Sequence, residues 1–145
     1  MATEPPERAA TLVDSNVLLD VLSADPQWSG WSTQALEDAA DRGPLAINPI
    51  IFAEVSVRFT RIEDLEDALP SSDFARLPLP WPAAFLAGKA FLSYRRRAGS
   101  SRTPLPDFYI GAHAAVSRLR LLTRDAARYR TYFPTVEVIA PRDAG

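Results

Sequence analysis

Four acidic residues occupy positions at which predicted strands end or the helices beside them begin. They are Asp14, Glu54, Asp107 and Asp125. If such carboxylates meet, each close pair repels by about 4 kcal/mol at about 4 Å with an effective dielectric near 20. The cluster then has to take up protons or divalent cations. Because oxygen ligands suit hard ions, these residues predict a Mg²⁺ or Mn²⁺ site, which could activate water for phosphodiester hydrolysis.

The composition excludes several other kinds of chemistry. The chain has no Cys and a single His, His113, which excludes Cys/His zinc sites, thiol catalysis and disulfides. The 145 residues predict one domain over residues 1–145, with residues 1–10 as a flexible N-terminus. No apolar stretch is long enough for a signal peptide or a membrane span, so we expect a cytoplasmic protein.

Short apolar runs alternate with amphipathic segments along the chain. The alternation predicts an α/β/α sandwich with a five-stranded parallel sheet and helices on both faces. Strands are expected at residues 11–13, 45–47, 74–79, 121–122 and 136–139. Helices are expected at residues 17–21, 32–41, 49–58, 62–69, 82–97, 105–118 and 126–132, with a loop at 100–104.

Three of the four acids also have a purely structural interpretation. Asp14 and Asp125 could cap the helices that follow them. Asp107, in the first turn of its helix, could complement the helix dipole. Glu54 is harder to explain in this way, because it is an isolated carboxylate in the apolar stretch Ile50–Val57 and shares a helix face with Ile50 and Ile51. A lone acid in such surroundings indicates a partner such as a cation.

The sequence resembles the PIN-domain ribonucleases, and among them the VapC-type toxins of bacterial toxin–antitoxin pairs. Four segments carry the resemblance, and their order and spacing extend over nearly the whole chain, from about Leu12 to Ile139. They are Leu12–Asp20, Asn48–Val55, Leu105–Ala114 and Leu121–Asp125.

The resemblance implies a metal site made by the four acids and Mg²⁺- or Mn²⁺-dependent cleavage of RNA. It also implies a VapB-type antitoxin that blocks the acidic pocket, and a homodimer. Ser15 stands where the family often has Thr, and the hydroxyl is kept. Asn16 would orient the first carboxylate, and Thr123 would help to hold a metal-bound water or Asp125.

Residues outside the acids support weaker predictions. A basic run could contact RNA phosphates or simply be a solvated helix end; it comprises Lys89, Arg95, Arg96, Arg97 and Arg102. His113 should face away from Asp107, in packing or at the surface. Trp28 and Trp31 are expected against the core, or else on an exposed ridge for an antitoxin or RNA bases, and Trp81 is expected to pack. The acidic and basic stretch of residues 61–67 is expected to be a solvated helix face.

Three functions remain open at this point. The leading one is a toxin ribonuclease; the others are a housekeeping RNA-processing nuclease of the same fold and a non-catalytic binding module. A phosphoaspartyl fold is disfavoured because residues 14–16 lack a second Asp. The net charge of −2 does not exclude an RNA substrate, because setting aside four of the 18 acids leaves 14 against 16 basic residues.

Overall fold

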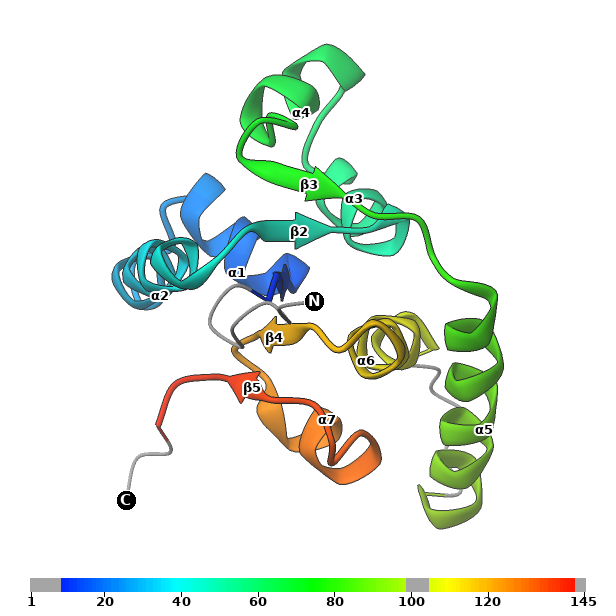
Figure 1. The fold of residues 1–145 in the computed structure, drawn as a ribbon. Helices are drawn as coiled ribbons and strands as arrows, with labels where there is room; N and C mark the ends of the chain where they lie inside the picture. Colours follow the sequence, from blue (N-terminus) through cyan, green and yellow to red (C-terminus); the bar gives the residue numbers. More distant parts are fainter. Residues whose placement is uncertain (1–8, 99–104, 143–145) are drawn as a thin grey trace, which may run out of the picture.

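The fold is built around a five-stranded sheet in which every strand is parallel to its neighbours. A computed structural model describes residues 9–98 and 105–142. The strands are β1 (Thr11–Val13), β2 (Leu45–Ile47), β3 (Phe74–Arg76), β4 (Arg120–Leu122) and β5 (Val138–Ile139). Their order across the sheet is β3-β2-β1-β4-β5 (Figure 1). The predicted α/β fold with a five-stranded parallel sheet is therefore confirmed.

Seven helices accompany the strands within the described residues. They are α1 (Ser15–Leu22), α2 (Ser29–Arg42), α3 (Pro49–Ser56), α4 (Ile62–Ala68), α5 (Trp81–Ala98), α6 (Leu105–Ser117) and α7 (Ala126–Tyr132). α1 packs against α2 and α3, and α6 packs against α3, α5 and α7. In Figure 1, α5 stands outermost beside α6.

Three strands form the centre of the core. Every residue of β1, β2 and β4 is buried, which requires cover on both faces of the sheet. This explains why each of these strands carries consecutive apolar residues rather than alternating ones. A second part of the core is aromatic: the ring of Phe108 lies 5.3 Å from that of Tyr132 and 5.5 Å from that of Tyr94, between centroids. Gly111 lets the Phe133 ring approach α6, because a Cβ there would overlap the ring.

The element boundaries differ from the predicted ones where local hydrogen bonding decides. β3 was expected to reach Leu79 but ends at Arg76, ahead of two prolines that cannot donate to a strand partner. The helix expected to reach Arg58 ends at Ser56, and the chain continues in a tight turn in which Arg58 N–H donates to the Val55 carbonyl.

β5 was expected from Val136 but begins at Val138, because Val136 N–H donates to the Phe133 carbonyl and belongs to a turn.

Nearer the N-terminus, α2 begins at Ser29 rather than Ser32. The Asp25 carboxylate accepts from the Gln27 and Trp28 N–H groups, and this organises the turn before the helix.

The tryptophans divide between buried and exposed positions. Trp28 and Trp31 are partly buried, with ring centroids 6.5 Å apart, and Trp31 packs against the core as expected. The prediction that Trp81 packs is wrong, since it is 88% exposed. α5 buries the face of Ala83, Ala87 and Ala90, and helical geometry puts Trp81 on the opposite side.

Some predictions fall on residues outside those the structure describes. These are most of the expected flexible N-terminus, the loop at 100–104 and Arg102. Residues 61–67 form the expected solvated face, with Leu65 buried and the others exposed. None of the helices in the described part of the chain combines the length and apolar character needed to cross a membrane.

Candidate metal centre

The strand order reverses between β1 and β4, and this places two of the four acids side by side. β1 connects onward toward β2 on one side, whereas β4 continues toward β5 on the other. In open parallel sheets, ligands bind in the crevice at such a reversal, outside the carboxyl ends of the strands. Asp14 directly follows β1, and Thr123, Arg124 and Asp125 directly follow β4. The topology therefore brings these residues together at one edge of the sheet.

Asp14 is the buried centre of a dense hydrogen-bond network. Its Oδ1 accepts from the N–H of Ser15, the first residue of α1, at 2.8 Å, and Asp14 occupies the N-cap position of this helix. Its Oδ2 accepts from the Thr123 hydroxyl at 2.8 Å, the Tyr129 hydroxyl at 3.1 Å and the Asn16 amide at 3.4 Å. The side chain thus joins β1, β4 and α7. A helix cap needs one bond, so capping alone does not explain this environment.

The Glu54 side chain is held by a hydrogen bond, and the helix that carries it is held by its N-cap. The Ser15 hydroxyl donates to its Oε1 at 2.9 Å, so the residue at the family's usual threonine position contacts Glu54. The helix that carries Glu54 begins at Asn48, whose Oδ1 accepts from the Ile51 N–H. The Asn48 amide in turn lies 3.0 Å from Nδ1 of buried His113. Because an amide N–H donates, His113 accepts through Nδ1, and burial lowers its pKa. This agrees with the packing role expected for His113.

Asp107 forms an ion pair within the site. Arg128 Nη1 donates to Asp107 Oδ2 at 2.5 Å. The two side chains are about equally exposed, 29% for Arg128 and 30% for Asp107. Asp107 thus lies nearer to solvent than Asp14 and already has a cationic partner.

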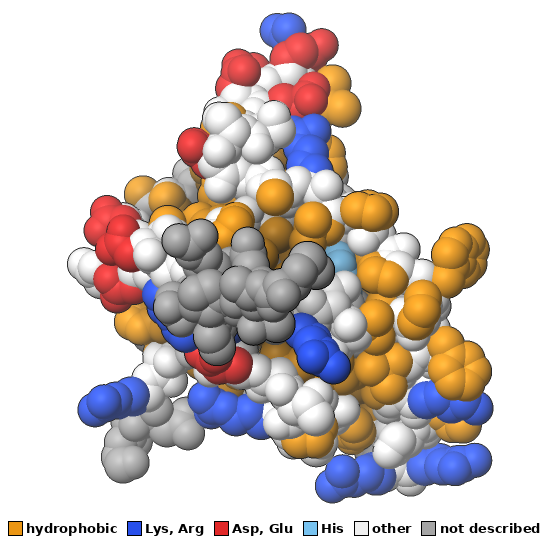
Figure 2. Space-filling view, in the orientation of Figure 1, with side chains coloured by type: hydrophobic (Ala, Val, Ile, Leu, Met, Phe, Trp, Pro, Cys, Tyr) orange, Lys and Arg blue, Asp and Glu red, His pale blue; other side chains and the backbone are white. Residues whose placement is uncertain are grey.

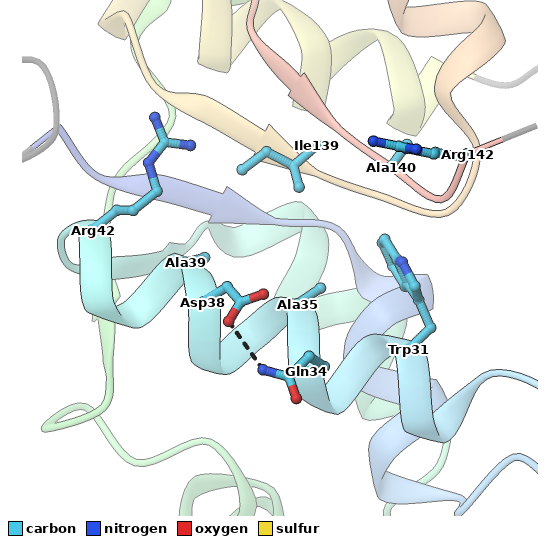
Figure 3. A pocket seen from close by; sticks show the side chains of 9 residues that line it. All are labelled: Trp31, Gln34, Ala35, Asp38, Ala39, Arg42, Ile139, Ala140 and Arg142. Carbon is cyan, nitrogen blue, oxygen red and sulfur yellow. Dashed lines mark hydrogen bonds between the residues drawn. The ribbon is translucent and has the colours of Figure 1, made fainter.

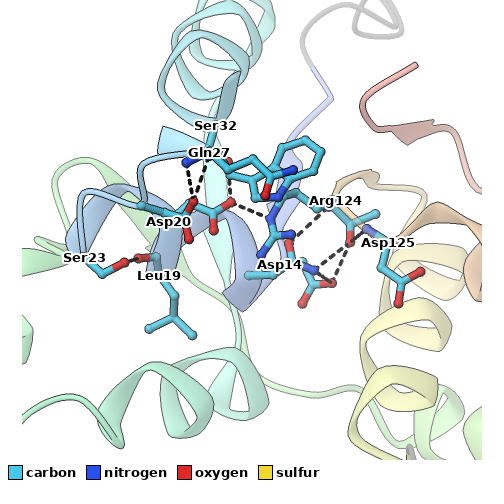
Figure 4. Close-up of polar contacts among 12 residues, drawn as sticks. Asp14, Leu19, Asp20, Ser23, Gln27, Ser32, Arg124 and Asp125 are labelled. Atoms are coloured by element: carbon cyan, nitrogen blue, oxygen red, sulfur yellow. Dashed lines mark hydrogen bonds and ion pairs between the residues drawn. The ribbon is translucent and has the colours of Figure 1, made fainter. Parts of the chain in front are cut away.

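Asp125 lies at the open side of the site. It occupies the N-cap position of α7, yet its side chain makes no capping hydrogen bond, and the residue is exposed. Figure 4 shows its carboxylate turned away from the network around Asp14 and Arg124. Its backbone is fixed, because Asp125 N–H donates to the Thr123 hydroxyl oxygen at 3.1 Å. Thr123 therefore connects the first and last acids through one oxygen.

The pKa shifts indicate that the acids influence one another, and the charge of Asp107 raises the pKa of both Asp14 and Glu54. Burial, and then the charges of Asp107 and Glu54, raise the pKa of Asp14 to about 6, against the Thr123 hydrogen bond that lowers it. Burial and Asp107 raise the pKa of Glu54, whereas the Ser15 hydrogen bond lowers it. Burial and Asp125 raise the pKa of Asp107, and Arg128 opposes them. All four acids thus belong to one electrostatic cluster.

This donor set fits a hard divalent cation in its chemistry. All the candidate ligands are carboxylate oxygens. Burial, and then the charges of neighbouring acids, raise the pKa values of Asp14, Glu54 and Asp107, so a cation would relieve an electrostatic cost. As the side chains stand, no three acidic or imidazole groups of the described residues are arranged to hold one ion. The ion pair with Arg128 keeps Asp107 engaged, so binding a metal requires side-chain rearrangement there.

Sequence reasoning missed several polar residues of this region. Tyr129 and Arg128 follow Asp125 by four and three positions on α7, and this helical spacing could have indicated them. Asp20 is buried and pairs with Arg124 Nε at 2.6 Å, while the Ser32 hydroxyl donates to the same oxygen at 2.7 Å (Figure 4). Asp20 is a lone acid in an apolar run, the same signal that indicated Glu54.

The Arg124 network anchors the loop that presents Asp125. Besides its bond to Asp20, Arg124 places its guanidinium 4.9 Å from the Trp28 ring centroid, and its N–H donates to Asn16 Oδ1 at 3.1 Å. The Asn16 amide also donates to Asp14 Oδ2 at 3.4 Å. Asn16 therefore links the Asp14 side chain to the loop after β4.

The described part of the predicted basic run comprises Lys89, Arg95, Arg96 and Arg97. It lies on α5 and forms no ion pair with the four acids among the described residues. Lys89 and Arg95 lie over the rings of Phe85 and Phe91, and Arg97 over Tyr132. In Figure 2, Lys and Arg side chains gather around α5, and Asp and Glu side chains gather over α4. A hollow of about 510 Å³ lies elsewhere, between α2 and the C-terminal segment (Figure 3). None of the four acids lines it.

The fold and the acidic site agree with a family match. The family model of the PIN domain matches residues 11–134, which is most of the chain. The chain therefore belongs to the PIN domain family, whose members are nucleases.

Solved structures with the same fold are toxin–antitoxin assemblies. A toxin–antitoxin complex from Klebsiella pneumoniae is 26% identical with a TM-score of 0.63, over 92% of this chain and 99% of that one. VapBC2 from Rickettsia felis, bound to a DNA fragment from its promoter, is 17% identical with a TM-score of 0.67, over 90% and 98%. VapBC-1 from nontypeable Haemophilus influenzae is 14% identical with a TM-score of 0.67, over 90% and 97%. No curated protein sequence matches the chain.

Proposed function

We propose that this protein is a Mg²⁺- or Mn²⁺-dependent endoribonuclease that acts as the toxin of a VapBC-type toxin–antitoxin pair. The observation that carries the proposal is the electrostatic cluster of Asp14, Glu54, Asp107 and Asp125 at the sheet's topological reversal. Membership of a nuclease family and likeness to toxin–antitoxin complexes support it.

In the proposed mechanism the four acids act together, and neighbouring side chains hold them in place. Asp14, Glu54, Asp107 and Asp125 would hold the ion, whose contribution when bound is to polarise a phosphate and lower the pKa of a water. Thr123 and Tyr129 fix the Asp14 carboxylate by donating to Oδ2. Ser15 fixes Glu54, and Asn48 fixes the start of the helix that carries it. No side chain of the chain has to act as a covalent nucleophile.

A cleavage assay tests the enzymatic part. Purified protein is incubated with cellular RNA in Mg²⁺, in Mn²⁺ and in EDTA. We expect cleavage only with a metal, and a loss of at least about 100-fold in Asp107→Asn, since even residues outside the ligands typically cost 10–100-fold. Asp67→Asn is the control, because it removes an acid from the exposed face of α4. Cleavage that persists in EDTA and in Asp107→Asn would contradict the mechanism.

Induction in a bacterial host tests the toxin role. Growth arrest that Asp14→Asn relieves is the expected result, and a short reading frame directly upstream, encoding an antitoxin, should suppress it. Cleavage without growth arrest would point instead to a housekeeping RNA-processing nuclease. Absence of Mg²⁺ or Mn²⁺ binding at millimolar concentration in calorimetry would point to a binding module.

We also propose that the protein forms a homodimer in the absence of antitoxin. Light scattering coupled to gel filtration tests this, and a monomer mass over the working concentration range would contradict it. Mapping the ends of cellular RNA after brief induction, beside Asp107→Asn, would identify the target.

A further inference from the structure

One basic side chain stands inside the acidic site. Of the ion pairs among residues 9–98 and 105–142, the pair of Arg128 with Asp107 includes a candidate site acid, and the other pairs do not. Arg128 lies on α7 between Ala127 and Tyr129, the residue whose hydroxyl donates to Asp14. Its guanidinium is therefore a fixed positive charge beside carboxylates that repel one another.

The guanidinium is also placed to reach a ligand from solvent. The Arg128 side chain is 29% exposed, and its guanidinium carbon lies 5.7 Å from the Tyr94 ring centroid of α5. One nitrogen, Nη1, donates to Asp107. An arginine carries five N–H donors in a planar fork, so further donors remain for a second acceptor.

We propose that Arg128 binds the RNA phosphate that is presented to the acidic site, and this rests on the function proposed above. A phosphodiester approaching four carboxylates meets net negative charge even after one divalent ion has bound. Arg128 reduces this charge at the site itself, and the guanidinium fork matches phosphate oxygens in bidentate geometry. Because Nη1 makes the bond to Asp107, the other N–H donors of the guanidinium would be available to a phosphate beside it.

The basic residues of α5 differ from Arg128 in position. Lys89, Arg95 and Arg97 are exposed and lie over aromatic rings, and none pairs with the site acids. They can attract RNA through long-range charge, which salt screens. Arg128 instead makes a direct contact at the point of chemistry, so its loss should weaken binding more than the loss of a charge that only attracts RNA from a distance.

Binding of a short fluorescent single-stranded RNA of mixed sequence tests the proposal. Fluorescence anisotropy is measured with Ca²⁺ in place of Mg²⁺, over a range of salt, and gels verify that the RNA stays intact. Arg128→Ala should weaken binding about tenfold, as for a lost hydrogen bond to a charged group. It should also reduce the slope of log affinity against log salt by about 0.7, the value for one phosphate of a single strand.

Two variants separate the contact from its charge. Arg130→Ala removes the same charge from an exposed position of the same helix, and should change affinity less than twofold. Arg128→Lys should keep the salt slope and recover part of the affinity, because lysine lacks the fork. If Arg128→Ala melts at a lower temperature than the parent, Arg128→Gln, which keeps most of the stem, replaces it.

Manganese binding provides a second measurement. Calorimetry should show that Arg128→Ala binds Mn²⁺ at least as tightly as the parent, because a competing cation has been removed from Asp107. Weaker Mn²⁺ binding would mean that Arg128 shapes the site rather than binding RNA, and would overturn the proposal. Unchanged RNA affinity in Arg128→Ala, with metal-dependent cleavage intact, would overturn it while leaving the proposed function standing. A parent protein that neither binds nor cleaves RNA would overturn the proposed function.

Discussion

Asp14 and Asp125 follow neighbouring parallel strands, yet their surroundings are opposite. Asp14 is 3% exposed and accepts hydrogen bonds from three side chains and one backbone N–H. Asp125 is exposed, and its carboxylate makes no capping bond to the helix it begins. The difference arises from position: β1 is the central strand of the sheet, whereas the loop after β4 runs to the surface.

The comparison teaches that the two sides of the site are stabilised differently. On the Asp14 side, the carboxylate itself is held. On the Asp125 side, the loop is held by Arg124 and Asp20, and the carboxylate is exposed. We expect substitutions on the two sides to separate stability from metal binding.

Removing the anchor of the Asp125 side should have the largest effect on stability. Asp20→Ala leaves the partly buried Arg124 guanidinium and the buried Ser32 hydroxyl without their shared acceptor. We expect the free energy of unfolding to fall by about 3 kcal/mol, the lower end of the range for breaking a buried ion pair, since Arg124 is partly exposed. Urea titration measures this. A change below about 1 kcal/mol would show that the loop does not depend on this pair.

Neutralising Asp14 should raise the free energy of unfolding of the metal-free protein, the opposite of the effect of Asp20→Ala. Its pKa is raised from 3.8 to about 6 in the folded protein, so between these values the folded state keeps a proton that the unfolded state has lost. Stability of the metal-free parent therefore falls as pH rises from about 4 to about 6, and remains lower above that.

Asp14→Asn should remove this cost. We expect the metal-free variant to be more stable than the parent by roughly 2–3 kcal/mol at pH 7–8, at about 1.4 kcal/mol per pKa unit, and the gain to vanish near pH 4. The Thr123 and Tyr129 hydroxyls can reverse to accept from an amide. Denaturant titrations in EDTA across this pH range measure the difference. A gain that does not depend on pH would contradict the argument.

The Tyr129 hydroxyl should have a smaller effect on the free energy of unfolding than the two preceding substitutions. Tyr129→Phe removes one of the donors to Asp14 Oδ2 and leaves the aromatic packing in place. The expected loss is about 1 kcal/mol, typical of a single hydrogen bond. Tyr132→Phe, on the same helix but without a bond to Asp14, is the matched control. Equal losses in the two variants would mean that the Asp14 contact adds nothing.

Asp125 should show the smallest effect on stability and a clear effect on metal. Asp125→Asn should change the free energy of unfolding by less than about 0.5 kcal/mol, as for an exposed residue without a structural contact. The same variant should weaken Mn²⁺ binding in calorimetry by at least about tenfold. A loss of stability without a loss of Mn²⁺ affinity would reverse the comparison between the two sides.

The sequence made several parts of the site predictable. Asn48 and Pro49 indicated the start of α3, and the structure places Asn48 at its N-cap. Glu54 stood out as an isolated acid in an apolar helix, and it is half-buried with a Ser15 partner. Other features depended on distant segments. Nothing local to Trp81 says that the opposite side of α5 faces the core, so its packing was predicted wrongly.

The partners of the acids were equally hidden from local patterns. Arg128 pairs with Asp107 across 21 positions, and Arg124 pairs with Asp20 across 104. Any of the fifteen arginines could have been expected near an acid. Which arginine lies beside Asp107 depends on how α7 docks on α6, and sequence spacing does not determine that docking.

By itself, the sequence determined the alternation of short buried strands with helices, and so a parallel sheet whose strand ends carry the acids. Hydrophobic periodicity and helix caps are local, and neighbouring residues suffice to specify them. Only the tertiary structure decided which acid is enclosed, which is open and which is paired with arginine. Burial and the distances between charges are set by segments far apart in the chain. An aspartate carboxylate is therefore a buried hydrogen-bond acceptor after β1 and an exposed group after β4.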